Sequence, residues 1–146
     1  MNRKGLESLQ VWQKARELTV LVCKELLLMF PDEEKFALSQ QLRRAVQSVP
    51  ADIAEAHGRY HYQDAIRFCY IARGSLDETL SHLILAHDLG YIPDESLVTC
   101  REIWEEVYRM LIGYIEYLKR NREEDISLKI RDEGWSAEYD MTRPDP

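Results

Sequence analysis

This sequence contains few glycines, prolines and cysteines and no long apolar run. Each of these shortages argues against one or more classes of protein. The 146 residues include only six glycines and five prolines, which favours helices joined by short turns. The three cysteines are far apart and never in CxxC spacing, which argues against a disulfide framework and a zinc site. The most apolar stretch, residues 18–30, contains charged side chains and is too short to span a bilayer. Since the N-terminus has no continuous apolar leader, we expect a cytoplasmic protein without membrane spans.

The charge of the chain is negative and unevenly distributed. Lysine and arginine total 19 against 26 aspartates and glutamates, and the net charge of −7 has the wrong sign for generic nucleic-acid binding. Residues 122–146 hold four basic and eight acidic side chains, so more than half of the excess lies in this last segment. We therefore predict one bundle domain over residues 1–121 and an acidic C-terminal tail over residues 122–146.

The predicted tail also carries three large apolar side chains, Trp135, Tyr139 and Met141. Such side chains are costly to leave in water. The tail is therefore expected either to be flexible or to dock onto its own bundle, a neighbouring subunit or another protein.

Apolar side chains recur every three or four residues through most of residues 8–121, which is typical of amphipathic helices. The pattern predicts four helices: residues 8–29, a second one that ends at Gly58, residues 63–89 and residues 97–121. Long helices joined by short turns favour an all-α, antiparallel up-down-up-down four-helix bundle. Gly74, in the middle of the third helix, predicts either a close helix crossing or local flexibility.

The second helix has Pro50 in its interior. Proline cannot donate a backbone hydrogen bond and costs on the order of 3 kcal/mol inside a plain helix. The apolar face nevertheless continues in phase from Leu38 to Ala56, and Val49 would be a poor N-cap for a new helix. We therefore predict one proline-kinked helix. The alternative is that Pro50 ends one helix and starts another, with a solvated charged face.

Beside the apolar face of this helix runs a narrow stripe of polar side chains, which we call the polar seam. Its members are Gln41, Arg44, Ser48, Asp52, Glu55 and Arg59. The seam lies on the flank of the helix, where a neighbouring helix or a second subunit could cover it. Because a buried charge without a partner is destabilising, we expect Asp52 to meet a donor such as Arg44, and Glu55 to reach Arg59.

No pattern of a catalytic or metal site stands out. The sequence has no Glu-x-x-His pair of the kind found in di-metal bundles, no Gly-rich phosphate loop and no nucleophile elbow. His57, His61 and Asp64 are the best residues for a small metal site, but they lie at an expected helix end and in a polar connection. We therefore expect a non-enzyme without cofactor, metal or small-molecule substrate, and a metal-dependent enzyme is the weakest alternative.

Five motifs, in order and in spacing, resemble one known family. They are LQVWQKA at residues 9–15, FP at 30–31, QLRRAVQSVPADIAEA at 41–56, IARGSLDE at 71–78 and LGYI at 89–92. On these motifs the chain resembles the bacterial four-helix bundle proteins related to the 23S rRNA intervening-sequence protein. The central motif of that family reads like QLRRAxxSxPxNIAEG, so Asp52 replaces the usual Asn and Ala56 the usual Gly.

The resemblance implies a closed homo-oligomer, commonly a pentamer, with no established reaction. Relatives encoded beside diversity-generating retroelements bind a reverse transcriptase and its RNA. We therefore predict a non-enzymatic scaffold or adaptor for a protein or a structured RNA; the alternative is a nucleic-acid-binding accessory protein of a reverse transcriptase. Phosphate binding by so acidic a chain would need a local patch of arginines. The candidate contacts are Arg43, Arg67, Arg73, Arg101 and Arg109, together with Arg59 of the polar seam.

Overall fold

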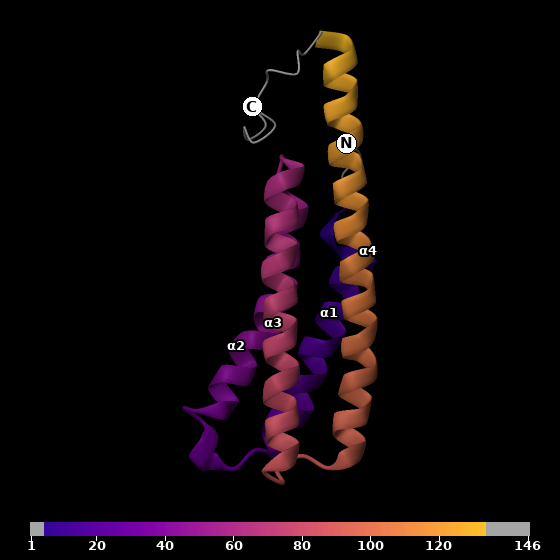
Figure 1. Cartoon of the computed structure of the whole chain (residues 1–146). Coiled ribbons are helices and arrows are strands. Elements are labelled where there is room, and N and C mark those ends of the chain that lie inside the picture. The colour runs from indigo at the N-terminus through magenta and orange to yellow at the C-terminus, as the bar shows by residue number, and fades with distance from the viewer. Residues whose placement is uncertain (1–4, 134–146) are drawn as a thin grey trace.

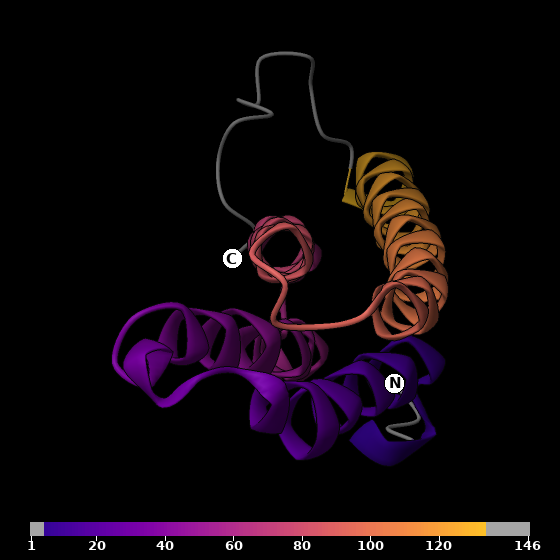
Figure 2. The same ribbon diagram turned by 90° about the horizontal axis from the view of Figure 1, so that it is seen from below.

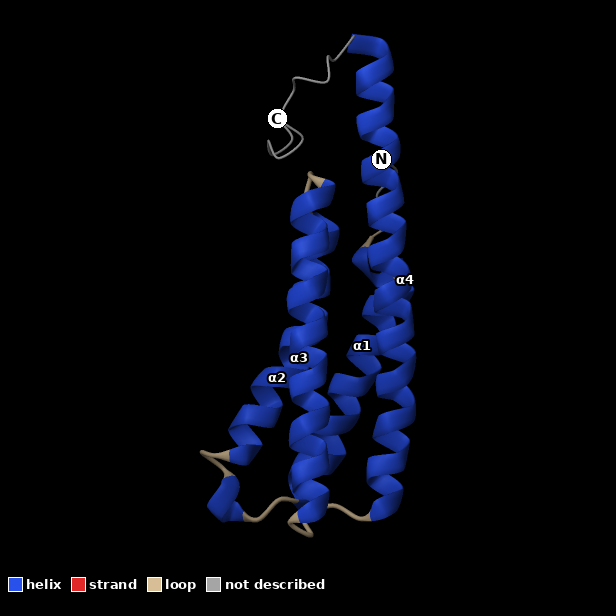
Figure 3. Ribbon diagram, in the orientation of Figure 1, coloured by secondary structure: helices blue, strands red, loops and turns tan. Residues whose placement is uncertain are grey.

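Helices joined by short turns make up the computed structural model of the chain (Figure 3). The structure describes residues 5–133, and in that range it contains no strand. Its four long helices are α1 (Gln10–Leu21), α2 (Leu38–Gly58), α3 (Tyr62–Asp88) and α4 (Asp94–Glu133). The all-α class and the four helices predicted from the apolar spacing are therefore confirmed. No helix within the described range is both long enough and apolar enough to cross a membrane.

The four helices pack in two rows around one core. Seen end on, α1 and α2 form one row, while α3 lies over α2 and α4 over α1 (Figure 2). Every helix contributes large, fully buried side chains, among them Leu18, Leu42, Ile53, Leu76 and Leu111. Figure 1 shows α3 and α4 side by side and running in opposite directions. The antiparallel order of the other pairs stays a prediction.

The helical stretch after α1 is irregular. It consists of a π-helical turn and two 3₁₀ turns, Val22–Leu26, Leu27–Met29 and Asp32–Glu34. α2 begins at Leu38, after the acidic residues of the last 3₁₀ turn. Glu34 still serves that helix end, because its Oε2 accepts a hydrogen bond of 3.0 Å from the backbone N–H of Leu38.

α2 continues without a break from Leu38 to Gly58, with Pro50 inside it. A helix boundary at Pro50 is thus excluded, whereas the bend predicted there stays a prediction. The whole predicted apolar face of this helix is buried: Leu38, Leu42, Ala45, Val49, Ile53 and Ala56. Packing of this face against the other helices stabilises a helix that proline alone would weaken.

α4 is longer than the sequence pattern predicts. Its apolar stripe ends at Leu118, and a helix end was expected near residue 121, yet the helix continues to Glu133. The residues after Leu118 are rich in Glu, Arg and Lys, which favour helix, and no Gly or Pro interrupts them before residue 134. Figure 1 shows this end of α4 extending beyond the other helices. The proposed tail residues Trp135, Tyr139 and Met141 lie outside the described range.

Candidate functional site on helices α2, α3 and α4

The rest of the chain covers the polar seam of α2 only in part. Ser48 and Asp52, at its centre, are half-buried. The remaining members are exposed: Gln41, Arg44, Glu55 and Arg59. Within one subunit the seam is therefore neither a buried network nor a freely solvated face.

Contacts within the seam agree only partly with those expected. The predicted pair of Arg59 and Glu55 is present, with Nη2 and Oε2 3.2 Å apart. The Ser48 hydroxyl donates to the backbone carbonyl of Arg44 at 2.8 Å rather than to a side chain. The guanidinium of Arg44 has no hydrogen bond, ion pair or ring contact within residues 5–133, so the expected pairing of Arg44 with Asp52 is wrong for the single subunit.

Asp52 meets α3 instead. Burial beside α3 raises the pKa of its carboxyl group, and the negative charge of Glu55 raises it further. A hydrogen bond with the Ser75 side chain, on α3, lowers the pKa and only partly offsets these effects. The carboxylate is therefore half-buried beside a hydroxyl group, and it has no cation partner among residues 5–133.

Gly74 precedes Ser75 and faces open space. It is exposed, and a Cβ added at this position would meet no atom within 4 Å. The close helix crossing predicted at Gly74 is thus wrong within one subunit.

A second group of functional candidates lies where α2 ends and α3 begins. We call it the cation–aromatic cluster, and it consists of two separate groups, Arg59 and Arg67 around the Phe68 ring and Arg73 and Lys119 around the Tyr70 ring. The guanidinium carbons of Arg59 and Arg67 lie 4.6 and 5.7 Å from the centre of the Phe68 ring. Around Tyr70, the Arg73 guanidinium carbon and the Lys119 Nζ lie 4.9 and 5.4 Å from the ring centre.

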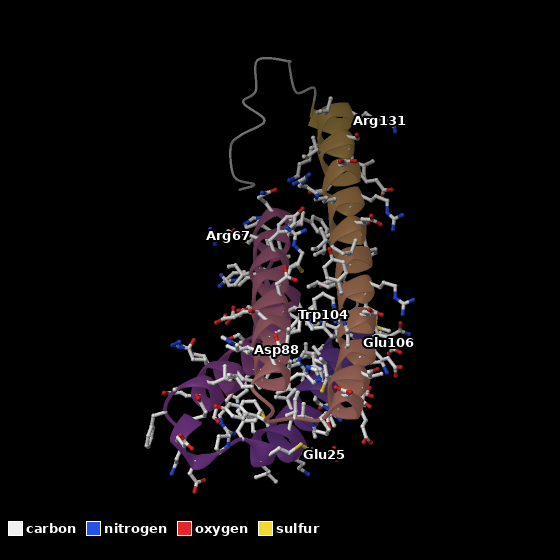
Figure 4. The ribbon with its side chains drawn as sticks, turned by 60° about the horizontal axis from the view of Figure 1, so that its bottom comes forward. Glu25, Arg67, Asp88, Trp104, Glu106 and Arg131 are labelled. Carbon is white, nitrogen blue, oxygen red and sulfur yellow. The ribbon has the colours of Figure 1, made fainter. Side chains whose placement is uncertain are left out.

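The cluster extends from α3 onto α4. Arg122 Nη1 donates to the side-chain oxygen of Gln63 over 2.6 Å, which joins α4 to the first turn of α3. Figure 4 shows Arg67 at this end of α3, pointing away from the bundle. Sequence reasoning missed Lys119 and Arg122, because only the packing of α4 against α3 brings them beside α3. The alternation of arginine and aromatic residues over 67–73 was the available signal.

The six arginines considered as partner contacts do not form one patch. Arg59 and Arg67 both lie over the Phe68 ring, whereas Arg73 lies over the Tyr70 ring. Arg43 borders a hollow at the corner between α1 and α2. Arg101 and Arg109 are exposed on α4 and make no polar or ring contact with the described residues.

Metal and thiol chemistry find little support in the described range. No group of three or more His, Cys, Asp or Glu side chains gathers there as a metal site, and this holds for His57, His61 and Asp64. Instead, the ring of His61 meets that of Tyr60 edge-on, with 4.9 Å between their centres. Burial raises the pKa of Cys69 to about 12 and that of Cys100 to about 11, which keeps both thiols protonated and unreactive.

Comparison with known proteins agrees with this fold. A crystal structure of a protein of unknown function from the S23 ribosomal protein family of Bacteroides thetaiotaomicron is similar, with 27% sequence identity and a TM-score of 0.66. The similarity covers 72% of this chain and 97% of that one. No curated protein matches. Residues 7–113 match the model of the 23S rRNA-intervening sequence protein family, and the chain therefore belongs to that family.

Proposed function

We propose that the protein is a non-enzymatic, cytoplasmic scaffold that forms a homo-oligomer through the neighbouring surfaces of α2 and α3. The observation that carries this proposal is the half-buried carboxylate of Asp52, which has a hydroxyl partner and no cation partner among the residues that the structure describes. Elsewhere on the same helix, the exposed guanidinium of Arg44 is unpaired within residues 5–133. Asp52 and Arg44 therefore carry opposite charges along the polar seam, and neither has a partner of opposite charge among residues 5–133.

Contact with a second copy supplies those partners. If Arg44 of one subunit contacts Asp52 of another, each side chain forms an ion pair that it does not form within the single subunit. Such a pairing favours one register of the subunits, because a charge left unpaired at a covered interface costs more than the pair contributes. Head-to-tail contacts of this kind close into rings, and a pentamer is the arrangement that the family resemblance favours.

The outer face of α3 favours the same contact. Ile71 and Leu85 are 47% exposed, although large aliphatic side chains are usually buried. Together with Gly74 they lie at helical spacing, so they share one face of α3. A second subunit lying along α3 would remove these apolar side chains from water and would find no Cβ in its way at Gly74.

Light scattering coupled to size-exclusion chromatography at physiological salt tests the oligomer directly. The full chain should elute as one homo-oligomer, and a monodisperse monomer would contradict the proposal. Gly74→Leu should break or reduce the assembly, because the new side chain has room within the subunit but not under a close neighbour.

Gly113→Leu is the matched control for this variant. Gly113 is also exposed within a helix, and a Cβ there also meets nothing within 4 Å. Both substitutions should stabilise the helix by about 1 kcal/mol, because leucine favours the helical conformation more than glycine does. Only the one at Gly74 should change the mass of the assembly.

A second candidate function is an accessory protein that binds a reverse transcriptase and a structured RNA. The pair of arginines over Phe68, Arg59 and Arg67, near the α2–α3 connection favours it over a scaffold for proteins alone. Purification of the protein from its native cells, with mass spectrometry and RNA sequencing of what accompanies it, separates the two functions. Recovery of neither a reverse transcriptase nor an enriched RNA would remove this candidate.

A further inference from the structure

We propose that Thr19 is a positioning residue for the polar seam. Its hydroxyl group gives α2 the hydrogen bond that Pro50 cannot give, and this bond fixes the two halves of the seam relative to each other. Thr19 lies on α1, outside both α2 and the seam. The hydrogen bond does not depend on the proposed function, whereas its effect on assembly rests on the proposed homo-oligomer.

Pro50 leaves one backbone carbonyl of α2 without its usual donor. In an α-helix the carbonyl of each residue accepts a hydrogen bond from the N–H four residues further on. Pro50 has no N–H, so the carbonyl of Val46 loses this partner. Because Val46 is fully buried, water cannot take the place of the missing N–H. A buried carbonyl without a donor would destabilise the helix at this point.

The neighbouring helix supplies the donor. Figure 2 shows α1 and α2 side by side in one row. Thr19 Oγ1 lies 3.0 Å from the carbonyl oxygen of Val46 on α2 and 2.8 Å from that of Ala15 on α1, and the hydroxyl hydrogen is shared between them. The Ala15 carbonyl already has the backbone N–H of Thr19 as its helical partner. The Val46 carbonyl therefore gains more from the hydroxyl group than the Ala15 carbonyl does.

Other hydroxyl groups of the bundle show what is particular to Thr19. Ser48, Thr79 and Thr99 each donate to the carbonyl four residues earlier in their own helix, over 2.8–2.9 Å. Thr19 makes the same local bond, but its hydroxyl group also reaches a second helix. The carbonyl that it reaches there is the one that proline deprives of a donor.

Pro50 also divides the polar seam into two halves. The seam residues Asp52, Glu55 and Arg59 follow it, and Arg44 lies in the half that precedes it. From Pro50 to Arg59 the helix rises by about 13 Å, so a change of about 10° in its direction at Pro50 would move Arg59 by about 2 Å. Such a shift is enough to break an ion pair or a hydrogen bond. The hydrogen bond at Val46 therefore controls the spacing of the two charges that are proposed to pair between subunits.

A double-mutant cycle tests the hydrogen bond in the full chain at one protein concentration. Thr19→Val keeps the shape of the side chain but removes the hydroxyl group, and it should lower the melting temperature by about 4 °C or more. In the Pro50→Ala background the same substitution should change it by less than about 1 °C, because alanine restores the N–H for the Val46 carbonyl. Equal losses in the two backgrounds would overturn the inference.

Two further variants show whether the loss belongs to this hydroxyl group. Thr19→Ser keeps the hydroxyl and should show less than about half of the decrease seen for Thr19→Val. Thr79→Val is the matched control, because Thr79 is fully buried and donates to the Ser75 carbonyl, which also has a helical N–H donor. It should lower the melting temperature by less than about 1 °C. A loss as large as that of Thr19→Val would contradict the special role of the Val46 carbonyl.

Light scattering over a dilution series tests the effect on assembly. Thr19→Val should raise the concentration at which the oligomer dissociates by about ten-fold or more, whereas Thr19→Ser should stay within about two-fold of the unmodified chain. If Thr19→Val lowers the melting temperature as expected but leaves this concentration unchanged, Thr19 stabilises the fold without positioning the seam, and the inference fails.

Amide hydrogen exchange separates the failure of this inference from the failure of the proposed function. A monomeric unmodified chain would contradict the scaffold. Even then, Thr19→Val should speed the exchange of the amides of residues 51–58 by about ten-fold relative to those of residues 100–118 on α4. Unchanged exchange in residues 51–58, or an equal increase in both segments, would overturn the positioning role in a monomer and in an oligomer alike.

Discussion

The polar side chains at the two ends of the bundle have different kinds of partner. At the end where α1 is followed by α2 and α3 by α4, polar groups meet one another: the Tyr91 hydroxyl donates to Glu34 Oε1 at 3.1 Å, and Glu34 Oε2 accepts from Leu38 N–H. At the opposite end, Arg59 and Arg67 have a carboxylate partner each, whereas Arg73 and Lys119 lie over the Tyr70 ring without one among residues 5–133. We call these the closed end and the open end. The hydrogen bonds at the closed end stabilise the fold, whereas some of the cations at the open end have no carboxylate partner among the described residues and can contact another molecule.

The largest effect that would test this comparison is expected at Phe30, in the closed end. Its ring is 7% exposed and lies 5.6 Å from that of Tyr91. Phe30→Ala removes most of a buried ring and should lower the free energy of unfolding by about 3 kcal/mol, measured by urea denaturation.

Phe36→Ala is the control for that measurement. Phe36 lies in the same connection between α1 and α2 but is 81% exposed, so its loss should change the free energy of unfolding by less than about 0.5 kcal/mol. Equal losses for the two variants would mean that the closed end is not packed as described. All variants should be compared at one protein concentration, since assembly contributes to apparent stability.

A smaller effect is expected at Glu34, whose carboxylate connects Tyr91 to the first turn of α2 at the closed end. Glu34→Ala removes the acceptor for Tyr91 and for the first N–H of α2, and should cost about 1–2 kcal/mol in thermal or urea unfolding. Glu33→Ala, at the neighbouring exposed position, deletes a similar charge without a hydrogen bond among the described residues. A loss of similar size in both variants would point to helix–dipole electrostatics rather than to the hydrogen bonds.

A pH-dependent effect is expected at the other connection of the closed end. The hydrogen bond that the His87 ring donates to the Asp94 carboxylate raises the pKa of His87, burial opposes this, and Asp88 adds to the rise. Because the folded state holds the proton more tightly, this stabilisation is full below the ordinary histidine pKa of about 6.5 and is lost as pH rises through the higher folded value.

The sign of that effect can be measured in melting curves between about pH 5 and 8. The melting temperature of the unmodified chain should fall relative to that of His87→Gln as the pH rises through this window. NMR titration of the His87 ring should give a pKa above that of a histidine side chain free in solution. A pKa below that of the free side chain would contradict the assignment.

The sequence predicts the core of this molecule better than its surface contacts. Positions such as Leu42, Val49 and Ile53 follow from helical periodicity alone, and all three are buried. The end of α4 could not be predicted from the same signal, because loss of an apolar stripe marks where packing ends and not where the helix ends. Periodicity shows which residues leave the core, whereas propensity decides whether they remain helical.

Contacts between helices depend on a register that periodicity does not contain. Asp52 meets Ser75, 23 positions further along the chain, because of how α2 lies against α3. Lys119 reaches Tyr70 for the same kind of reason. Contacts within one helix, such as Glu55 with Arg59, were predictable because four residues make about one turn.

The smallest effect on stability is expected at the open end. It tests directly whether a cation there stabilises the fold. Arg67 has an ion pair of 3.8 Å with Asp64 and lies 5.7 Å from the Phe68 ring centre, yet its side chain is 66% exposed. Solvent screens both interactions, so Arg67→Ala should change the free energy of unfolding by less than about 0.5 kcal/mol. A loss above about 1 kcal/mol would show that the cation stabilises the fold, as groups at the closed end do. With the expected small loss, the same variant can be used in binding experiments, where any defect would report on the surface and not on folding.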